Sequence, residues 1–186
     1  MKGALALLIS IATIGLACRF IKPINPTATP NPTSSAEAAT TPTPPAESLR
    51  DLAEARNLFI GAAVNVNALQ KDSQYAETLG REFNMVVAEN VMKFEHIHPE
   101  RDRYDFSDAD LLVDYAASHD MAIRGHTLVW HSQVPRWVER GDWTKEELKA
   151  ILRDHILTEV GRYRGRVRAW DVVNEAIDDD GSLRET

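Results

Sequence analysis

Asn174 and Glu175 place an amide beside a carboxylate at the end of an apolar stretch, Val167–Val173. The stretch is rich in β-branched residues and is predicted to be a strand, so the pair would lie where that strand leaves the core. Trp170 and Val173 would partly enclose Glu175, and burial raises the pKa of a carboxyl group toward that of a general acid at neutral pH. Glu175 is therefore a candidate for proton transfer.

An acid in this position can also be structural, because carboxylates are favoured near helix N-termini and in solvated loops. Asp178, Asp179 and Asp180 fit that alternative better than Glu175 does.

A second group of polar residues, Glu89, Asn90 and Lys93, follows another apolar stretch. Together they offer hydrogen-bond acceptors and donors in alternation, which suits a ligand with many hydroxyl groups. The alternative is a local ion pair at the surface, which contributes little to stability.

The segment GHTLVWH, residues 125–131, supplies two histidines and a tryptophan after a third apolar stretch. Histidines five positions apart are not a usual zinc pair. The indole of Trp130 offers a flat apolar face with one donor, and sugars present flat C–H faces rimmed by hydroxyls. Alternatively Trp130 belongs to the core, and for His131 alone a hydrogen-bonded core position is favoured. His126 stays with the ligand-binding candidates.

A metal site is disfavoured. His96 and His98 form an H-x-H pair, but no partner carboxylate is evident near them, so we expect neither a metal nor a cofactor.

These candidates lie on a repeating β-then-α pattern. The predicted strands are residues 58–64, 83–89, 121–129 and 167–173, with apolar sequences typical of parallel strands that are covered on both faces. Helices are predicted over 68–80, from Ser107 to His119, behind the capping box that begins at Thr144, and after the fourth strand, where the chain stops at Thr186.

Every polar candidate follows the C-terminal end of a strand, the edge that carries the active site in a (β/α)8 barrel. A doubly wound sheet is less favoured because no glycine-rich phosphate loop follows the first strand. A barrel needs about 250 residues. Residues 48–186 therefore predict an α/β fold of the TIM-barrel type with only the first four or so βα units present.

The N-terminal segment is predicted to direct export. Residues 1–18 combine a basic start, a short apolar core and small residues before Cys18, which indicates a signal peptide. GLAC resembles a lipobox, so lipidation of Cys18 and ordinary cleavage both stay open. Residues 19–47 hold seven of the nine prolines and indicate an extended linker. We expect a secreted protein, or one lipid-anchored to the outer face of a bacterial membrane.

The chain has a formal net charge of −7 and a single cysteine, which excludes an internal disulfide. No basic cluster is present, so nucleic acid is an unexpected partner.

Three segments, residues 89–110, 124–138 and 170–184, together resemble glycoside hydrolase family 10, whose typical members are endo-1,4-β-xylanases. The resemblance implies a TIM barrel that hydrolyses xylan with retention of configuration, without a cofactor, and as a monomer at full length. It implies that Glu175 is the acid/base and that Asn174 binds the sugar 2-OH. It also implies that Glu89, Asn90, Lys93, His126 and Trp130 line the glycone subsites, and that His131 adjoins the site.

The family's nucleophile, a glutamate at the end of the seventh strand, has no counterpart in this chain. We therefore expect a fragment of a longer enzyme, one that neither folds stably nor hydrolyses xylan alone. Three other hypotheses stay open: a glucan-active member of the family, a non-catalytic sugar-binding remnant tethered to the surface, and a metal-dependent hydrolase that uses His96 and His98.

Overall fold

The structure is a computed structural model that describes residues 47–185. The predicted signal, Cys18 and nearly all of the predicted linker lie outside the described residues. In the part that is described, no helix is long and apolar enough to cross a membrane.

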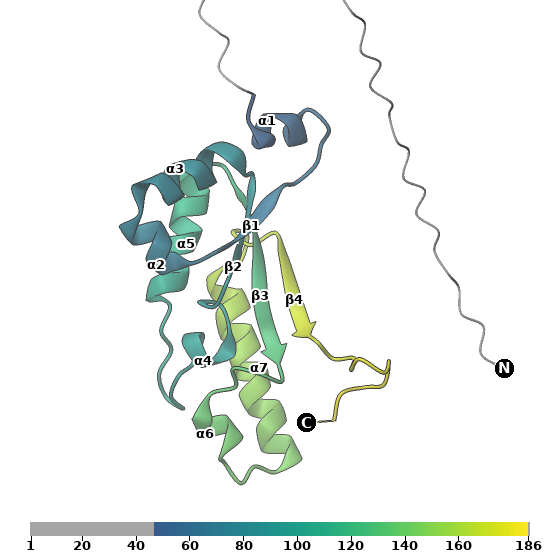
Figure 1. The fold of residues 1–186 in the computed structure, drawn as a ribbon. Coiled ribbons are helices and arrows are strands. Elements are labelled where there is room, and N and C mark those ends of the chain that lie inside the picture. Colours follow the sequence, from purple (N-terminus) through teal and green to yellow (C-terminus); the bar gives the residue numbers. More distant parts are fainter. Residues whose placement is uncertain (1–46, 186) are drawn as a thin grey trace, which may run out of the picture. The chain divides into compact units, whose positions relative to one another are not determined.

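Four parallel strands form one sheet in the order β1-β2-β3-β4 (Figure 1). They are β1 (Gly61–Val64), β2 (Met85–Ala88), β3 (Ala122–Trp130) and β4 (Ala169–Asn174). Each strand pairs in parallel with the next one along the chain, so every connection is a βαβ crossover. This topology agrees with the first half of a (β/α)8 barrel.

The crossover helices lie on one side of the sheet (Figure 1). α2 (Val66–Lys71) and α3 (Ser73–Glu82) follow β1; α4 (Phe94–Ile97) and α5 (Ser107–Ser118) follow β2; α6 (Arg136–Glu139) and α7 (Lys145–Arg162) follow β3. α1 (Leu49–Glu54) precedes the sheet. At the start of α7 the predicted capping box is present: Thr144 Oγ1 accepts from the Glu147 N–H, and Glu147 accepts from the Thr144 N–H.

Two predicted elements differ from the structure. The first strand begins at Gly61 rather than at residue 58, because Leu58 and Phe59 lie outside the ladder and are exposed. The helix predicted over 68–80 is two helices that meet at Asp72, whose backbone is extended. The carboxylate of Asp72 caps the second helix by accepting from the Tyr75 N–H, so one residue ends α2 and starts α3.

The core lies between the sheet and the helices. Val64, Val86 and Ile123 come from neighbouring strands, point to the helix side and are buried. They pack with Leu112 of α5 and with Tyr163, which follows α7. Alternate residues on each strand point the other way, as the pleat requires.

The predicted covering of both sheet faces is not found within residues 47–185. Helices cover one face, and Val172 on the last strand is 55% exposed. β1 and β4 are the two edges of the sheet. Within the described part of the chain both of these edges are open.

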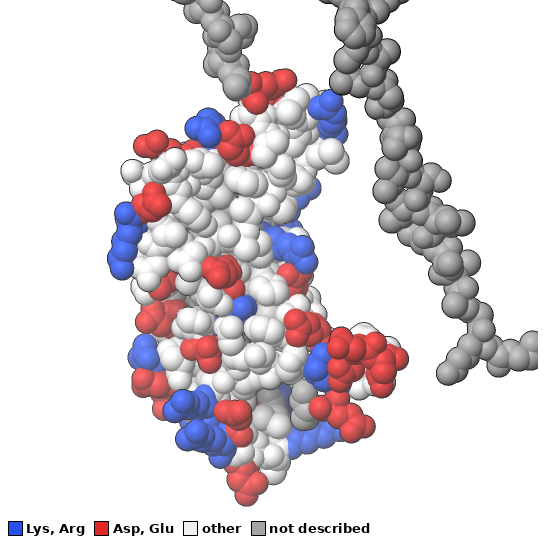
Figure 2. All heavy atoms as spheres, viewed as in Figure 1, with Lys and Arg blue, Asp and Glu red and all other residues white. Residues whose placement is uncertain are grey.

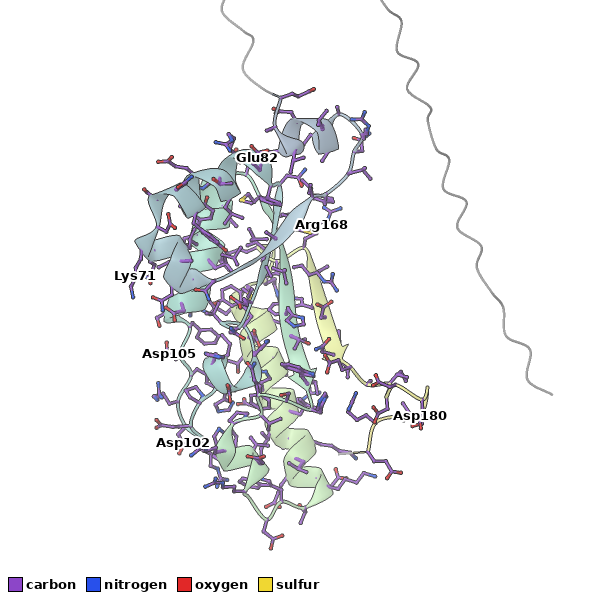
Figure 3. The ribbon with its side chains drawn as sticks, in the orientation of Figure 1. Lys71, Glu82, Asp102, Asp105, Arg168 and Asp180 are labelled. Carbon is purple, nitrogen blue, oxygen red and sulfur yellow. The ribbon has the colours of Figure 1, made fainter. Side chains whose placement is uncertain are left out.

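The fourth predicted helix is absent from the described residues. A loop follows β4 instead, closed by an antiparallel bridge between Ile177 and Leu183. Arg168 and Asp180 mark opposite ends of this region: Arg168 precedes β4, and Asp180 lies at the tip of the loop (Figure 3). Acidic residues gather on this loop, whereas charges of both signs alternate over the rest of the visible face (Figure 2).

Gly125 is required for close packing within the sheet. It pairs with Trp170 on β4, and a Cβ at this position would lie 2.2 Å from Cε3 of the Trp170 ring.

In the complete protein, Gly125→Ala is expected to lower the free energy of unfolding by about 1–3 kcal/mol, because the indole must move within a packed core. Urea titration measures the change. The control is Gly161→Ala near the end of α7, where a Cβ meets nothing within 4 Å and should stabilise the helix by about 0.5 kcal/mol. Equal effects at the two glycines would contradict the packing argument.

Candidate active site

The polar residues that follow the strands meet at the C-terminal edge of the sheet. Trp130, the last residue of β3, is the ladder partner of Asn174, the last residue of β4. Glu175 comes next and adopts φ 52°, a left-handed conformation that is uncommon for a residue with a side chain. This backbone turn takes the chain out of the strand directly after Asn174.

The carboxylate of Glu175 accepts a hydrogen bond from Trp130 Nε1 at 2.9 Å. The Nε2 atom of His131 lies 3.8 Å from the same carboxylate oxygen. His131 is therefore beside Glu175 rather than in the core, which corrects the position favoured from sequence. The Glu175 side chain is 51% exposed, so within the described residues the predicted apolar enclosure is not provided.

Lys93 links the end of β2 to the end of β3. Its ammonium group donates to Asn90 Oδ1 at 3.0 Å and lies 4.7 Å from the centre of the Trp130 ring. Lys93 is only 8% exposed, so the alternative of a solvated surface ion pair does not apply to it. Because Asn90 Oδ1 accepts from Lys93, the amide group of Asn90 has its NH₂ free to donate elsewhere.

His126 is held by a carboxylate that the sequence did not single out. Its Nδ1 lies 2.9 Å from Asp171 Oδ2, and Arg124 donates to Asp171 Oδ1 through Nε and Nη2 at 2.9 and 2.6 Å. Burial alone would raise the pKa of Asp171, but the hydrogen bonds from Arg124 and His126 outweigh it and lower that pKa. An ionised carboxylate only accepts, so Nδ1 of His126 carries a proton and Nε2 is left for another partner.

Asp171→Asn is expected to remove this preference, because an amide can donate to Nδ1 as well as accept from it. Imidazole ¹⁵N chemical shifts of His126 should move from the Nδ1–H form toward a mixture of tautomers. Asp179→Asn, an exposed position on the loop after β4, is the control and should leave the shifts unchanged. An unaltered His126 spectrum in Asp171→Asn would contradict the assigned role.

Asp171 and Arg124 had a signal in the sequence. Each is a charged residue within an otherwise apolar strand, and a charge that is taken out of water is costly unless it is paired. Gln133 carried no such signal. Its Nε2 lies 3.5 Å from Asn90 Oδ1, and its buried Oε1 finds no hydrogen-bond partner within the described residues.

His96 and His98 point to different environments. His98 is buried, and its Nε2 lies 3.0 Å from the backbone oxygen of Arg101, whereas the His96 side chain is 44% exposed. Within residues 47–185 no group of three His, Cys, Asp or Glu side chains has the arrangement of a metal site.

A hollow of about 740 Å³ lies beside Glu175, between the end of β4 and α7. Its lining includes four residues at the strand ends, namely Trp130, His131, Asn174 and Glu175. It also includes Leu148 and Ile151 from α7. The arrangement thus offers a carboxyl group, an indole, an ammonium group and two amides at one edge of the sheet.

The described residues match one protein family. The model of glycosyl hydrolase family 10 matches residues 48–186. Endo-1,4-beta-xylanase B of Thermotoga neapolitana is 49% identical over 140 residues, which are 74% of this chain and 40% of the relative. Endo-1,4-beta-xylanase 2 of Claviceps purpurea is 46% identical over 129 residues, which are 69% of this chain and 39% of the relative.

Solved structures of xylanases are also similar to this chain. Xylanase 10B from Thermotoga petrophila RKU-1, in complex with xylobiose, is 49% identical with a TM-score of 0.70, over 75% of this chain and 43% of that one. Native xylanase 10B from Thermotoga maritima is 50% identical with a TM-score of 0.70, over 75% and 44%. The chain thus spans well under half the length of the relatives and structures that it matches.

Proposed function

Because this chain belongs to glycosyl hydrolase family 10, we propose that it forms the amino-terminal part of the catalytic domain of an endo-1,4-β-xylanase. The substrate is xylan, and the reaction is hydrolysis of internal β-1,4-xylosidic bonds with retention of configuration. The names of the relatives support this activity, and one similar structure holds xylobiose.

The contact between Glu175 and Trp130 carries the proposal. One hydrogen bond of 2.9 Å joins the candidate acid to an indole at the sheet edge that holds catalytic residues in barrel enzymes. A pyranose ring can lie on the indole face while its scissile oxygen approaches the carboxyl group. Asn174 is the ladder partner of Trp130, and its proposed role is to hydrogen-bond the 2-OH of the same sugar.

The remaining candidates form the glycone side of the site. Lys93 and Asn90 present N–H donors, and Glu89 presents a carboxylate oxygen as an acceptor. His126, with Nδ1 committed to Asp171, offers Nε2 to a sugar hydroxyl. Together they match the hydroxyl groups that rim a xylose unit.

In the proposed mechanism Glu175 first donates its proton to the leaving glycosidic oxygen. A second carboxylate, about 5–5.5 Å from the first in retaining enzymes, attacks the anomeric carbon and forms a glycosyl-enzyme. Glu175, now ionised, then takes a proton from the water that releases the sugar. We assign the second carboxylate to a strand that lies beyond the four described ones.

Further βα units beyond Thr186 are part of the proposal. They would cover the exposed face of the sheet and pair with the free edge of β4, where Val172 and Val173 are each 55% exposed. Such a surface in an isolated chain invites aggregation. The proposed active form is therefore the complete domain.

Export stays a prediction from sequence. We propose that the protein is secreted, or that it is held at the outer face of a bacterial membrane by a lipid on Cys18. Fractionation of cells that express the complete protein tests export, and loss of palmitate labelling in Cys18→Ser tests the anchor.

The activity is tested by incubating the complete protein with xylan and with carboxymethylcellulose. Release of reducing ends from xylan is the expected result, and the Glu175→Gln variant should bind xylan without cleaving it. Cleavage of the glucan alone would assign a glucanase. An inactive wild type that still binds xylan would assign a binding protein.

A further inference from the structure

Asn65 is the first residue after β1 and lies beside Glu89, the first residue after β2. Val64 and Ala88 are ladder partners, and the Glu89 N–H donates to the Val64 carbonyl at 3.1 Å. Neither sequence pattern nor the proposed mechanism uses Asn65. Its place nevertheless brings a β1 residue to the edge that carries the candidate site.

Asn65 is held by hydrogen bonds through its backbone and through its side chain. Its backbone N–H donates to the Tyr75 hydroxyl at 3.2 Å, and its Oδ1 accepts from the Ala68 N–H at 3.1 Å, which caps α2. Its Nδ2 donates to Glu89 Oε2 at 2.9 Å. One side chain therefore caps a helix with its oxygen and contacts a candidate substrate-binding residue with its nitrogen.

The orientation of the amide is determined by these partners. The Ala68 N–H is a donor, so the amide atom that faces it must be the oxygen. The NH₂ group then has to face Glu89, whose ionised carboxylate only accepts. If the amide were reversed, its NH₂ group would face the Ala68 N–H and its oxygen would face the Glu89 carboxylate. Donor would then meet donor, and acceptor would meet acceptor.

We propose that Asn65 is a positioning residue that holds the carboxylate of Glu89 in the orientation that accepts sugar hydroxyls. The inference rests on the proposed function, because that function gives Glu89 its role on the glycone side. Glu89 is exposed at the end of its strand, so without a partner its side chain would sample several rotamers. The hydrogen bond from Asn65 fixes the position of Glu89 Oε2. The other oxygen, Oε1, is left to accept from the substrate.

The capping role and the positioning role can be separated by substitution. Serine and aspartate are good N-cap residues, so Asn65→Ser and Asn65→Asp keep the cap of α2. Both remove the NH₂ donor, and Asn65→Asp adds a charge that repels Glu89. The matched control is Asp72→Ser, which alters the cap of the next helix, where Asp72 accepts from the Tyr75 N–H at 3.1 Å.

The experiment measures kcat and KM of the complete protein on 4-nitrophenyl β-xylobioside. Asn65→Ser should raise KM about 5- to 30-fold, because the freed Glu89 side chain must be ordered again each time a sugar binds, with kcat within about twofold. Asn65→Asp should raise KM further. Asp72→Ser should leave KM unchanged, and all three variants should unfold at temperatures within a few degrees of the wild type.

A double-mutant cycle separates positioning from a general structural role. In the Glu89→Ala background, Asn65→Ser should have no further effect on KM, because the side chain that it positions is gone. An unchanged KM in Asn65→Ser, or the same rise with and without Glu89, would overturn the inference while xylan hydrolysis by the wild type stands. A wild type without activity on xylan or on the aryl xylobioside would instead overturn the proposed function.

Discussion

Glu175→Ala is expected to lower kcat/KM for xylan about 10²- to 10⁴-fold in the complete protein, the usual contribution of a general acid. The glycosidic oxygen of xylan is a poor leaving group and needs a proton as the bond breaks. Glu175 is the carboxyl group at the sheet edge that contacts Trp130. Its removal takes away the proton donor but leaves the indole of Trp130, on which the sugar ring is proposed to lie.

An activated substrate should respond differently. With 2,4-dinitrophenyl β-xylobioside the leaving phenolate needs little protonation, so formation of the glycosyl-enzyme should proceed at nearly the wild-type rate in Glu175→Ala. Breakdown of that intermediate still needs a base to activate water, so it becomes slow and a burst of dinitrophenolate should appear. Stopped-flow absorbance measures both phases.

Asp179→Ala is the control for this prediction, because Asp179 is an exposed acid on the loop that follows Glu175. In Asp179→Ala the rates with xylan and with the dinitrophenyl substrate should both stay within about twofold of the wild-type rates. If Glu175→Ala lowered the burst rate and the turnover of xylan by equal factors, Glu175 would not be the general acid.

The second large effect is expected from Glu159, a carboxyl group inside α7. Glu159 and His155 are both fully buried, and their Oε2 and Nε2 atoms are 3.4 Å apart. Neither Glu159 oxygen has a hydrogen-bond partner within residues 47–185. Burial raises the pKa of Glu159 to about 9, and burial followed by repulsion from His98 lowers the pKa of His155 to about 4.

These shifts give stability a defined pH dependence. The folded state keeps a proton on Glu159 that the unfolded state releases near pH 4.5, so stability falls as pH rises from there toward 9. His155 acts oppositely, because the unfolded state gains a proton below pH 6.5 that the folded state takes up only near 4. The two nearly cancel between about pH 4.5 and 6.5, and Glu159 dominates above that range.

Glu159→Met is therefore expected to be more stable than the wild type at alkaline pH. The difference should grow by on the order of 3 kcal/mol between pH 6.5 and 9, since one pKa unit corresponds to about 1.36 kcal/mol. Urea unfolding of both proteins across this range measures it. Glu146→Gln, at an exposed position of the same helix, is the control, and its free energy of unfolding should change with pH as that of the wild type does. A pH-independent difference for Glu159→Met would show that the carboxyl group is ionised in the folded state.

Much of the fold could be predicted because its signals are local. The capping box at Thr144 and the β-branched run before Asn174 each specify an element, and the order of four βα units with polar residues at the strand ends specifies the sheet. The (β/α)8 class is confirmed by the family match and by the similar structures. The break at Asp72 was missed because the apolar pattern continues through it, although an aspartate before Ser73 is itself a capping signal.

The site was harder to predict, because its contacts join residues distant in sequence. The sequence pattern put Trp130 and Glu175 at the C-terminal ends of their strands, but it did not indicate that an indole N–H would bind the carboxylate. Nothing local indicated that Asp171 would hold His126, or that Asn65 would face Glu89, since both contacts depend on strand register. The predicted enclosure of Glu175 failed because half of its side chain faces solvent in the described residues.

Azide trapping separates an acid/base from a nucleophile at position 175. Glu175→Ala is mixed with 2,4-dinitrophenyl β-xylobioside and sodium azide, and the product is identified by ¹H NMR. If Glu175 is the acid/base, azide attacks the glycosyl-enzyme without needing a base, restores turnover and yields β-xylobiosyl azide. An α-configured azide would make Glu175 the nucleophile, and no rescue at all would remove it from the reaction.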